Sequence, residues 1–210
     1  LSAEEAPKLR PYMALAEQLG SLVGQLAHGS IAGLAIETEG AAAELNMKPI
    51  TSAVLAGFMR VHSDTVNMVN APVMAKERGL DVREVRHDRE GDYHTLLRVT
   101  AMTQAGERSV AGTLFGNSAP RLVEIFGIKV EADLAGEMLY IVNEDAPGFI
   151  GRVGTTLGEA GVNIGTFQLG RRSAGGEAVL LLSVDSHVDQ DVVAKIAALP
   201  GVRTVKPLKF

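Results

Sequence analysis

The residues best suited to chemistry in this chain of 210 residues are concentrated in one short stretch of its last third. Asn143 and Asp145 stand just before Pro147-Gly148, and the Pro-Gly pair opens a predicted helix. The first turn of a helix presents free N–H groups at the positive end of its dipole, which suits a carboxylate. With Asn163, which begins the next predicted strand, the stretch offers an anion site, a carboxylate for an ammonium and two amides. An amino-acid zwitterion needs this set; the alternative is that these polar residues only end a strand and form turns.

The glycines of the same stretch do not indicate a dinucleotide site. Gly148, Gly151 and Gly154 are spaced G-x-x-G-x-x-G, whereas the dinucleotide-binding loop reads G-x-G-x-x-G. Arg171 and Arg172 end the following strand, where such folds need an acidic residue for the ribose. We therefore expect a tight turn at Gly148, and we expect Gly151 and Gly154 to let the helix lie close on the sheet. No cofactor is expected in this chain.

Catalytic and metal sites are not indicated elsewhere. The absence of cysteine excludes disulfides, thiolate zinc sites, iron–sulfur clusters and cysteine nucleophiles. The five histidines form no H-x-x-x-H pair, and no G-x-S-x-G elbow marks a serine nucleophile. His87 and His94 flank an expected hairpin and could approach each other, although exposure to solvent is favoured. Arg121 and Lys129 could hold an anion, or could simply be solvated at the surface. We expect no catalytic residue and no metal.

Composition narrows the class of protein. Hydrophobic residues make up 46% of the chain and charged residues 21%, which is typical of a globular core rather than of disorder. The net charge of −5 argues against a nucleic-acid partner, which usually meets a basic surface. No apolar run is long enough to span a bilayer. The chain begins at Leu1 without a methionine, so we expect it to start within a longer gene product.

The first part of the chain alternates helices and strands, as α+β domains do. Apolar spacing predicts one helix over the first twenty-odd residues; its apolar stripe must be buried against a partner that could be missing in part. Two more helices are expected, over 49–61 and about 70–78, the second with Asn70 as N-cap and Pro72 in its first turn. Strands are expected over 30–39, 82–87, 93–103, 109–115 and 121–126, with hairpin turns at 88–92 and 104–107.

The end of the chain predicts a β-α-β-β-α-β order, which is the ferredoxin-like arrangement. The expected elements are a strand over 138–143, a helix over 148–161, strands over 163–171 and 177–185, a helix over 189–199 and a strand over 202–208. A short acidic and small-residue stretch, Glu131-Ala-Asp-Leu-Ala-Gly136, precedes them and predicts a domain boundary. We therefore expect an α+β fold in three parts: a leading helix at 1–25, a mixed α/β domain at 26–135 and a ferredoxin-like domain at 137–210.

The ferredoxin-like part resembles a known family of domains. Val142-Asn-Glu-Asp-Ala-Pro-Gly-Phe-Ile-Gly151 and Leu157-Gly-Glu-Ala-Gly-Val-Asn-Ile164 look like the ACT domain. This resemblance implies an amino-acid sensor built on a βαββαβ fold. It also implies that the domain acts on an enzyme rather than as one.

The preceding residues resemble the intervening, allosteric-substrate-binding domain of long-form D-3-phosphoglycerate dehydrogenase. The similar stretches are Val69-Asn-Ala-Pro72, Glu77-Arg-Gly79 and Ser109-Val-Ala-Gly-Thr-Leu-Phe-Gly116. Glu4-Glu-Ala-Pro-Lys-Leu-Arg-Pro-Tyr12 and Leu15-Ala-Glu-Gln-Leu-Gly-Ser21 look like the helix that leads out of that family's catalytic portion. The resemblance covers essentially the whole chain in the family's order.

This resemblance implies a place in L-serine biosynthesis. Members of the family oxidise D-3-phosphoglycerate to 3-phosphohydroxypyruvate with NAD, in the cytoplasm, as the first step of the phosphorylated route to L-serine. Their nucleotide-binding and catalytic domains precede the region seen here. Nothing in this chain matches the family's catalytic Arg-Glu-His set or its dinucleotide fingerprint. The resemblance therefore implies a regulatory C-terminal part that is inactive alone, with NAD bound only by the parent enzyme.

The resemblance also implies an effector site. In the family, L-serine binds between neighbouring ACT domains of a homo-oligomer and gives feedback control. The matching positions here are Asn143, Asp145, Pro147, Gly148 and Asn163. The N–H groups near Phe149 and Ile150 would take the effector's carboxylate. One departure is Asn143, where relatives often carry histidine or tyrosine.

The partners implied are L-serine, the chain's own catalytic domains and other copies of the chain, without nucleic acid or membrane. For the intervening domain, the resemblance implies an anionic or substrate-like ligand near Arg121 and Lys129. Two other functions stay open. The related iron–sulfur L-serine dehydratase pairs similar accessory domains, but the absence of cysteine counts against it unless a separate subunit holds the cluster. A purely structural oligomerisation module would form oligomers and ignore serine.

Overall fold

The computed structural model describes residues 5–89 and 91–210. The chain divides into two compact units, one ending at Phe126 and the other beginning at Gly127. Both combine helices with a sheet, which confirms the expected α+β fold. The division comes ahead of the acidic stretch 131–136, at which the sequence predicts a boundary.

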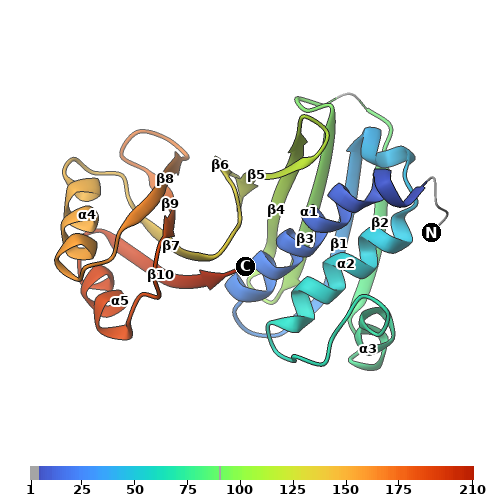
Figure 1. The fold of residues 1–210 in the computed structure, drawn as a ribbon, viewed down its shortest axis with the longest axis horizontal. Coiled ribbons are helices and arrows are strands. Elements are labelled where there is room, and N and C mark those ends of the chain that lie inside the picture. The colour runs from blue at the N-terminus through green and yellow to red at the C-terminus, as the bar shows by residue number, and fades with distance from the viewer. Residues whose placement is uncertain (1–4, 90) are drawn as a thin grey trace. The chain divides into compact units, whose positions relative to one another are not determined.

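The first unit is a twisted sheet with helices on one face (Figure 1). Its helices are α1 (Glu5–Leu26), a short 3₁₀ turn η1 (Ala41–Glu44), α2 (Met47–Arg60) and α3 (Ala71–Glu77). Its strands are β1 (Ile31–Gly40), β2 (Asp81–His87), β3 (Thr95–Thr103), β4 (Gly106–Phe115) and β5 (Ala119–Ile125). The sheet order is β2-β1-β3-β4-β5, with only the β1–β2 pair parallel. The helices and strands expected from the sequence are confirmed within a few residues.

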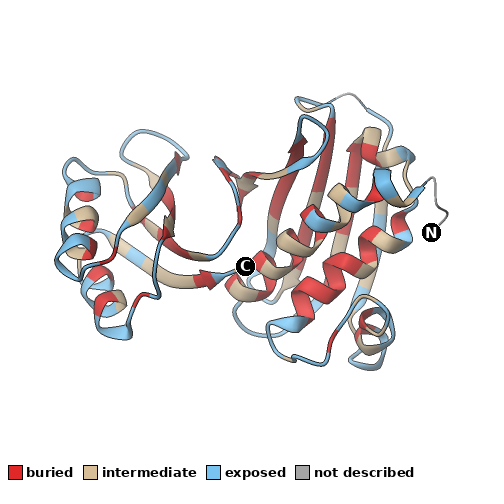
Figure 2. Ribbon diagram, in the orientation of Figure 1, coloured by how far each residue is buried: buried red, intermediate tan, exposed pale blue. Residues whose placement is uncertain are grey.

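Helix α1 buries its apolar stripe within this unit. Leu15, Leu19 and Leu22 are at most 1% exposed, against α2 and the sheet. Helices α1 and α2 approach so closely that a Cβ on Gly57 would lie 2.1 Å from the Glu17 carbonyl oxygen. Helix α2 is red along most of its length, because residues 53–59 are all buried (Figure 2). Helix α1 therefore needs no partner from outside the chain to cover its apolar stripe.

The prediction of a hairpin at 88–92 is wrong, because strands β2 and β3 do not pair with each other. Strand β2 pairs in parallel with β1, and β3 pairs with the opposite edge of β1, so β1 lies between them. His87 and His94 are thus on either side of β1; the His87 Nε2 instead lies 2.8 Å from a Glu37 carboxylate oxygen. The second expected hairpin, at 104–107, is confirmed by the antiparallel β3–β4 pair. Composition marks a turn in both places but does not say which strands the turn connects.

Asn70 occupies the N-cap position of α3 without making the expected capping bond. Its Oδ1 accepts a hydrogen bond from the Asn67 N–H at 2.8 Å, and its Nδ2 donates to the Thr65 carbonyl at 2.9 Å. The side chain therefore shapes the turn that leads into the helix.

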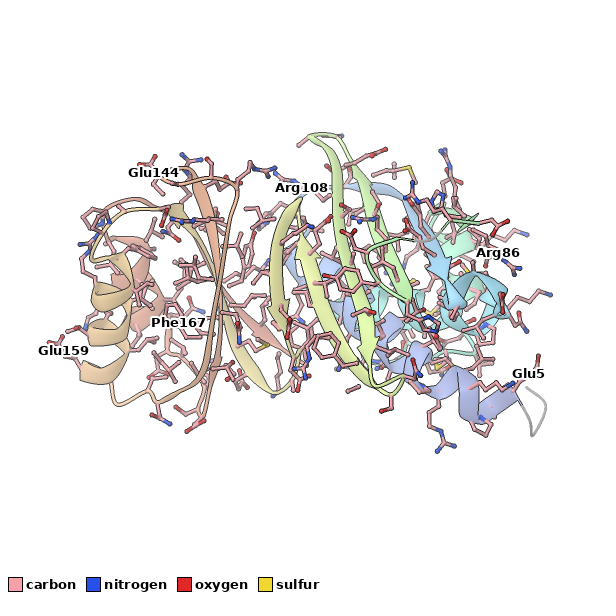
Figure 3. All side chains as sticks on the ribbon, turned by 90° about the horizontal axis from the view of Figure 1, so that it is seen from above. Glu5, Arg86, Arg108, Glu144, Glu159 and Phe167 are labelled. Carbon is pink, nitrogen blue, oxygen red and sulfur yellow. The ribbon has the colours of Figure 1, made fainter. Side chains whose placement is uncertain are left out.

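The second unit has the predicted ferredoxin-like order. Its elements are β6 (Ile128–Ala132), β7 (Glu137–Glu144), α4 (Phe149–Glu159), β8 (Ile164–Arg171), β9 (Glu177–Val184), α5 (Gln190–Ala197) and β10 (Val202–Lys209). Strands β7–β10 form an antiparallel sheet in the order β10-β7-β9-β8. One face packs against α4 and α5 around a core that includes Leu139, Val153 and Leu180. Phe167 of β8 lies between this sheet and the helices, whereas Glu144 and Glu159 project from the surface (Figure 3).

Strand β6 was not expected from the sequence, and it packs close to β8. A Cβ on Gly170 of β8 would lie 2.3 Å from the Lys129 carbonyl oxygen of β6. Because side chains alternate along a strand, Gly170 faces away from the side on which its neighbours Leu169 and Arg171 lie. The glycine therefore permits the backbone of β6 to reach the face of the sheet opposite the helices.

Candidate functional site

A cavity of about 460 Å³ opens where β7 ends and α4 begins. Its lining residues are Asn143, Asp145, Ala146, Pro147, Gly148, Phe149, Ile150, Leu169, Arg171 and Gly175. The structure therefore brings together every predicted effector residue except Asn163. A volume of this size is within the range of small-molecule sites.

The turn at Gly148 starts the helix at the cavity, which Phe149 and Ile150 of the first turn help to line. Gly148 has φ of 81°, a left-handed conformation that favours glycine. The Phe149 N–H donates to the Ala146 carbonyl at 3.3 Å and closes the turn. In the described part of the chain, no backbone acceptor is found for the N–H groups of Ile150 and Gly151. These two donors, at the positive end of the helix dipole, suit an anionic group.

Asn143 lines the cavity and carries an unsatisfied acceptor. The residue is only 1% exposed, and its Nδ2 donates to the Glu144 carbonyl oxygen at 2.8 Å. Its Oδ1 is buried and accepts no hydrogen bond from any described residue. A buried polar atom left without a partner costs about 1–3 kcal/mol, so such atoms usually have one. A ligand that carries a hydroxyl or an ammonium would satisfy this oxygen.

Asp145 is an ionised carboxylate held from two sides. Its Oδ2 accepts hydrogen bonds from Arg171 Nη1 at 2.7 Å and from the Gly175 N–H at 3.3 Å. The Arg171 guanidinium and, next, the Gly175 N–H hold the pKa of the Asp145 carboxyl below its ordinary value. The backbone of Asp145 also donates to the Gly176 carbonyl at 2.8 Å. The loop before α4 is therefore fixed to the hairpin between β8 and β9.

Arg171 is the residue of this site that sequence reasoning missed. Its place at the end of a strand argues only against a dinucleotide-binding fold, which needs an acidic residue there. The strand register contains the signal: Ala178 of β9 pairs with Asn143 on one side and with Arg171 on the other. Once the sheet order is known, Arg171 must lie in the same row as Asn143. The sequence alone does not contain that order.

Asn163 lies at the opposite end of the sheet. It immediately precedes β8, whose first residue pairs with Val184, whereas Arg171 at the other end pairs with Ala178. The Asn163 Nδ2 donates to an Asp185 carboxylate oxygen at 2.6 Å. A single copy of the chain therefore does not bring Asn163 to the cavity.

The expected role of Gly151 and Gly154 is wrong. A Cβ on either residue would meet no atom within 4 Å. The helix α4 thus does not need these glycines in order to approach the sheet. The contact with the sheet is made instead by Phe149, Val153 and Leu157, at helical spacing on the other side of α4.

Comparison with known proteins now identifies both units. Residues 8–126 match the family model of the D-3-phosphoglycerate dehydrogenase intervening domain. The chain belongs to that intervening-domain family. Residues 138–201 match the ACT domain, which confirms the resemblance of the second unit. Hereafter the first unit is called the intervening domain and the second the ACT domain.

Three relatives are similar over almost the whole chain, and each is named D-3-phosphoglycerate dehydrogenase. The protein of Bacillus subtilis (strain 168) is 36% identical over 207 residues, which is 98% of this chain and 39% of the relative. That of Synechocystis sp. is 36% identical over 212 residues, 100% of this chain and 38% of the relative. That of Methanocaldococcus jannaschii is 36% identical over 203 residues, which is 96% of this chain and 38% of the relative. The chain thus spans less than two fifths of the length of these relatives.

The two basic residues predicted to hold an anion belong to different units. Arg121 lies on β5 of the intervening domain, with its guanidinium carbon 5.2 Å from the centre of the Phe115 ring. Lys129 lies on β6 and is exposed. Their joint role in binding an anion stays a prediction.

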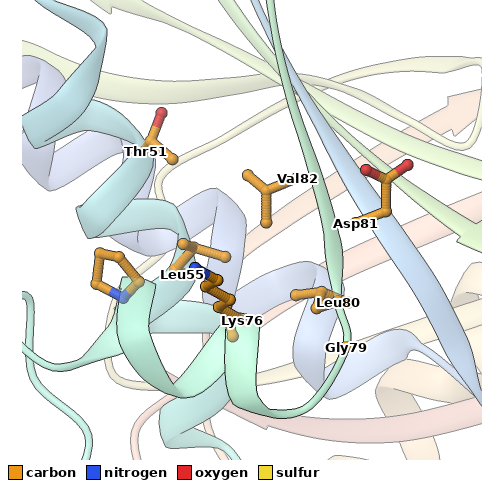
Figure 4. Close-up of a pocket in the computed structure, with 9 residues that line it drawn as sticks. Thr51, Leu55, Lys76, Gly79, Leu80, Asp81 and Val82 are labelled. Atoms are coloured by element: carbon orange, nitrogen blue, oxygen red, sulfur yellow. The ribbon is translucent and has the colours of Figure 1, made fainter.

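Another cavity, of about 410 Å³, lies in the intervening domain between α2, α3 and β2 (Figure 4). Its walls are mostly apolar and include Leu55, Leu80 and Val82. Lys76 extends from α3 toward Leu55, and the Thr51 hydroxyl at the other end donates to the Glu84 carboxylate at 2.5 Å. The cavity has room for a small apolar molecule, and no motif of the sequence points to it.

Residues 5–89 and 91–210 contain neither a metal-binding cluster nor a membrane-spanning helix. No group of three or more histidine, aspartate and glutamate side chains is placed to hold a metal ion there. Within the same residues, no helix combines the length and the apolar character needed to cross a membrane.

Proposed function

We propose that this chain is the regulatory part of a D-3-phosphoglycerate dehydrogenase and that its ACT domain binds L-serine for feedback control. The parent enzyme would oxidise D-3-phosphoglycerate with NAD in the cytoplasm, as the first step of L-serine biosynthesis. The intervening-domain match and the relatives' names support the parent enzyme. The observation that carries the ligand site is the Oδ1 of Asn143, a buried acceptor without a donor among the described residues, on a residue that lines the cavity.

Each functional group of L-serine has a counterpart at the cavity. The ammonium would bind Asp145, whose Oδ1 receives no hydrogen bond from the described residues. The carboxylate would bind the N–H groups of Ile150 and Gly151 at the start of α4. The hydroxyl would donate to Asn143 Oδ1. These assignments account for all three functional groups of the amino acid.

A second copy of the ACT domain would complete the site. Ile150 and Leu169 both line the cavity and are 52% and 37% exposed, so a partner that covers them would bury apolar surface at the site. A neighbouring copy would cover them and supply its Asn163, which this copy cannot bring to its own cavity. Serine would then favour the subunit arrangement that binds it more tightly. Such coupling between sites is commonly worth about 1–3 kcal/mol.

Isothermal titration calorimetry of the chain with L-serine tests the proposal. We expect saturable heat for the wild type and at least tenfold weaker binding for Asp145→Asn, because the amide cannot pair with the ammonium at full strength. Asp189→Asn is the matched control, since Asp189 precedes α5 and is exposed outside the cavity. The absence of heat with the wild type, or equal affinity in both variants, would refute serine binding at this site.

The structural oligomerisation module makes a different prediction. Under this hypothesis, light scattering should show a dimer or tetramer, and the midpoint of thermal unfolding should not respond to L-serine. A ligand confined to the folded form raises that midpoint with its concentration relative to Kd, so the two hypotheses separate in one titration.

A further inference from the structure

Among the described residues that line the ACT-domain cavity, Arg171 is the only cationic one and Asp145 the only anionic one. The remaining lining residues carry no charged side chain. The charges of the lining side chains therefore balance, with one carboxylate and one guanidinium; a second cation, Arg152, stands just outside the lining, with its Nη1 3.1 Å from where a Cβ on Gly148 would lie. A ligand of zero net charge but with two charged ends, an α-amino acid, matches that balance better than an amine or an acid does.

The contacts of Asp145 leave space for such a ligand. Both hydrogen bonds to its carboxylate, from Arg171 and from the Gly175 N–H, end on Oδ2. Oδ1 accepts none from the described residues, and a carboxylate has about four lone-pair positions. Arg171 therefore holds the carboxylate without consuming its capacity to bind an ammonium.

We propose that Arg171 is the specificity-determining residue of the cavity, which makes it select zwitterionic amino acids over the corresponding amines. This inference rests on the proposed function, because it concerns the same effector site. Arg171 offsets the negative charge of Asp145, which would otherwise repel the ligand's carboxylate. The same cation disfavours a ligand that carries only an ammonium. In water-accessible sites such interactions are moderate, because solvent screens them; Arg171 itself is 53% exposed.

Arg171 is also a positioning residue for Asp145. Charge-assisted hydrogen bonds are the strong ones, and this one is 2.7 Å long. It joins the end of β8 to the loop that carries Asp145. Loss of the guanidinium would leave the carboxylate with the 3.3 Å bond from Gly175 alone.

The test compares L-serine with ethanolamine, which is L-serine without its carboxylate. We expect Arg171→Gln to bind L-serine about tenfold more weakly than the wild type and to bind ethanolamine at least as well as the wild type. The affinity for L-serine divided by the affinity for ethanolamine should therefore be at least tenfold lower in Arg171→Gln than in the wild type. Arg171→Lys keeps the charge and should restore most of the ratio.

Arg172→Gln is the matched control. Arg172 is the next residue, is 55% exposed, lies 3.8 Å from a Glu177 carboxylate oxygen and does not line the cavity. It should leave both affinities unchanged. An independent readout is the pH titration of the Asp145 carboxyl carbon by NMR. Its midpoint should rise in Arg171→Gln, remain low in Arg172→Gln and recover in Arg171→Lys.

The outcomes separate the inference from the proposed function. If the wild type binds neither L-serine nor ethanolamine, both are overturned. If the wild type binds L-serine and Arg171→Gln keeps the same affinity ratio, serine sensing stands and the role of Arg171 is refuted. If Arg171→Gln loses both ligands equally, Arg171 only maintains the fold of the loop, and the selectivity is again refuted.

Discussion

Replacing Gly57 of α2 with alanine would place a methyl group against the backbone of α1. The added Cβ would lie 2.1 Å from the Glu17 carbonyl oxygen and 2.9 Å from the Ser21 nitrogen. Backbone atoms cannot turn aside as the end of a flexible side chain can. The two helices must therefore separate by about 0.9 Å for the shorter contact to reach 3.0 Å.

The cost of this separation exceeds the helix-forming advantage of alanine. Overpacking a close-packed core typically costs about 1–3 kcal/mol. A gap of 0.5–1 Å also removes roughly a quarter to a half of each dispersion contact across the interface. Alanine returns about 1 kcal/mol through helix propensity. We expect a net loss of about 2 kcal/mol of unfolding free energy, which is a fall of roughly 10 °C in the melting temperature of a domain of this size.

Thermal unfolding combined with hydrogen exchange of α1 and α2 peptides measures this effect in the intervening domain. The matched control is Gly154→Ala in α4, where the new Cβ would meet no atom within 4 Å. That change should stabilise the ACT domain by roughly 0.5–1 kcal/mol, because only the propensity gain applies. The reasoning fails if Gly57→Ala melts at or above the wild-type temperature, since the close helix contact would then carry no cost.

Three further predictions concern the ACT domain. Phe149→Ala should lose about 3–5 kcal/mol in chemical denaturation, because its ring is 2% exposed in the core. Gly170→Ala should cost roughly 1–3 kcal/mol, because its methyl would lie 2.3 Å from the Lys129 carbonyl, and faster hydrogen exchange of β6 checks it. Because the pKa of Asp145 is lowered by Arg171, its stabilisation is present above about pH 4 and is lost as the pH falls through the lowered value. Arg171→Gln should therefore lower the thermal midpoint at pH 6 and converge with the wild type toward pH 3; an equal loss at both pH values would contradict this.

Local patterns were sufficient to predict the ACT domain. Its strands and helices are short, follow one another at regular intervals and carry clear turn residues, such as Pro147-Gly148. The βαββαβ order then leaves few ways to build one sheet, because connections are short and right-handed where chirality applies. The predicted elements are confirmed within a few residues.

The topology of the intervening domain could not be predicted in the same way. The turn at 88–92 has hairpin composition, yet β2 and β3 are separated by β1. Turn residues determine where a strand ends, whereas pairing depends on which edges remain free once the helices cover the sheet. Strand β6 was missed for a related reason: its five residues follow a turn, and the last two already belong to the acidic stretch, so they resemble a linker.

For the candidate site, too, residues that are close in sequence could be predicted, whereas a residue from a distant strand could not. Asn143, Asp145 and Gly148 are within six positions of one another, and a single loop brings them together. Arg171 comes from a different strand, and only the register through Ala178 places it beside Asn143. The role given to Gly154 was wrong because spacing cannot tell which side of a helix faces the sheet.

The two faces of strand β8 differ in how well they tolerate substitution. Leu169 and Arg171 line the cavity, so if the cavity binds an amino acid as proposed, substitutions there would change which ligand is accepted and leave the backbone of the sheet in place. Gly170, between them, has no such freedom, because any side chain would strike the Lys129 carbonyl. New ligand preferences in this domain can therefore arise by single substitutions at alternate positions of one strand. The position between them stays tied to the packing of the fold.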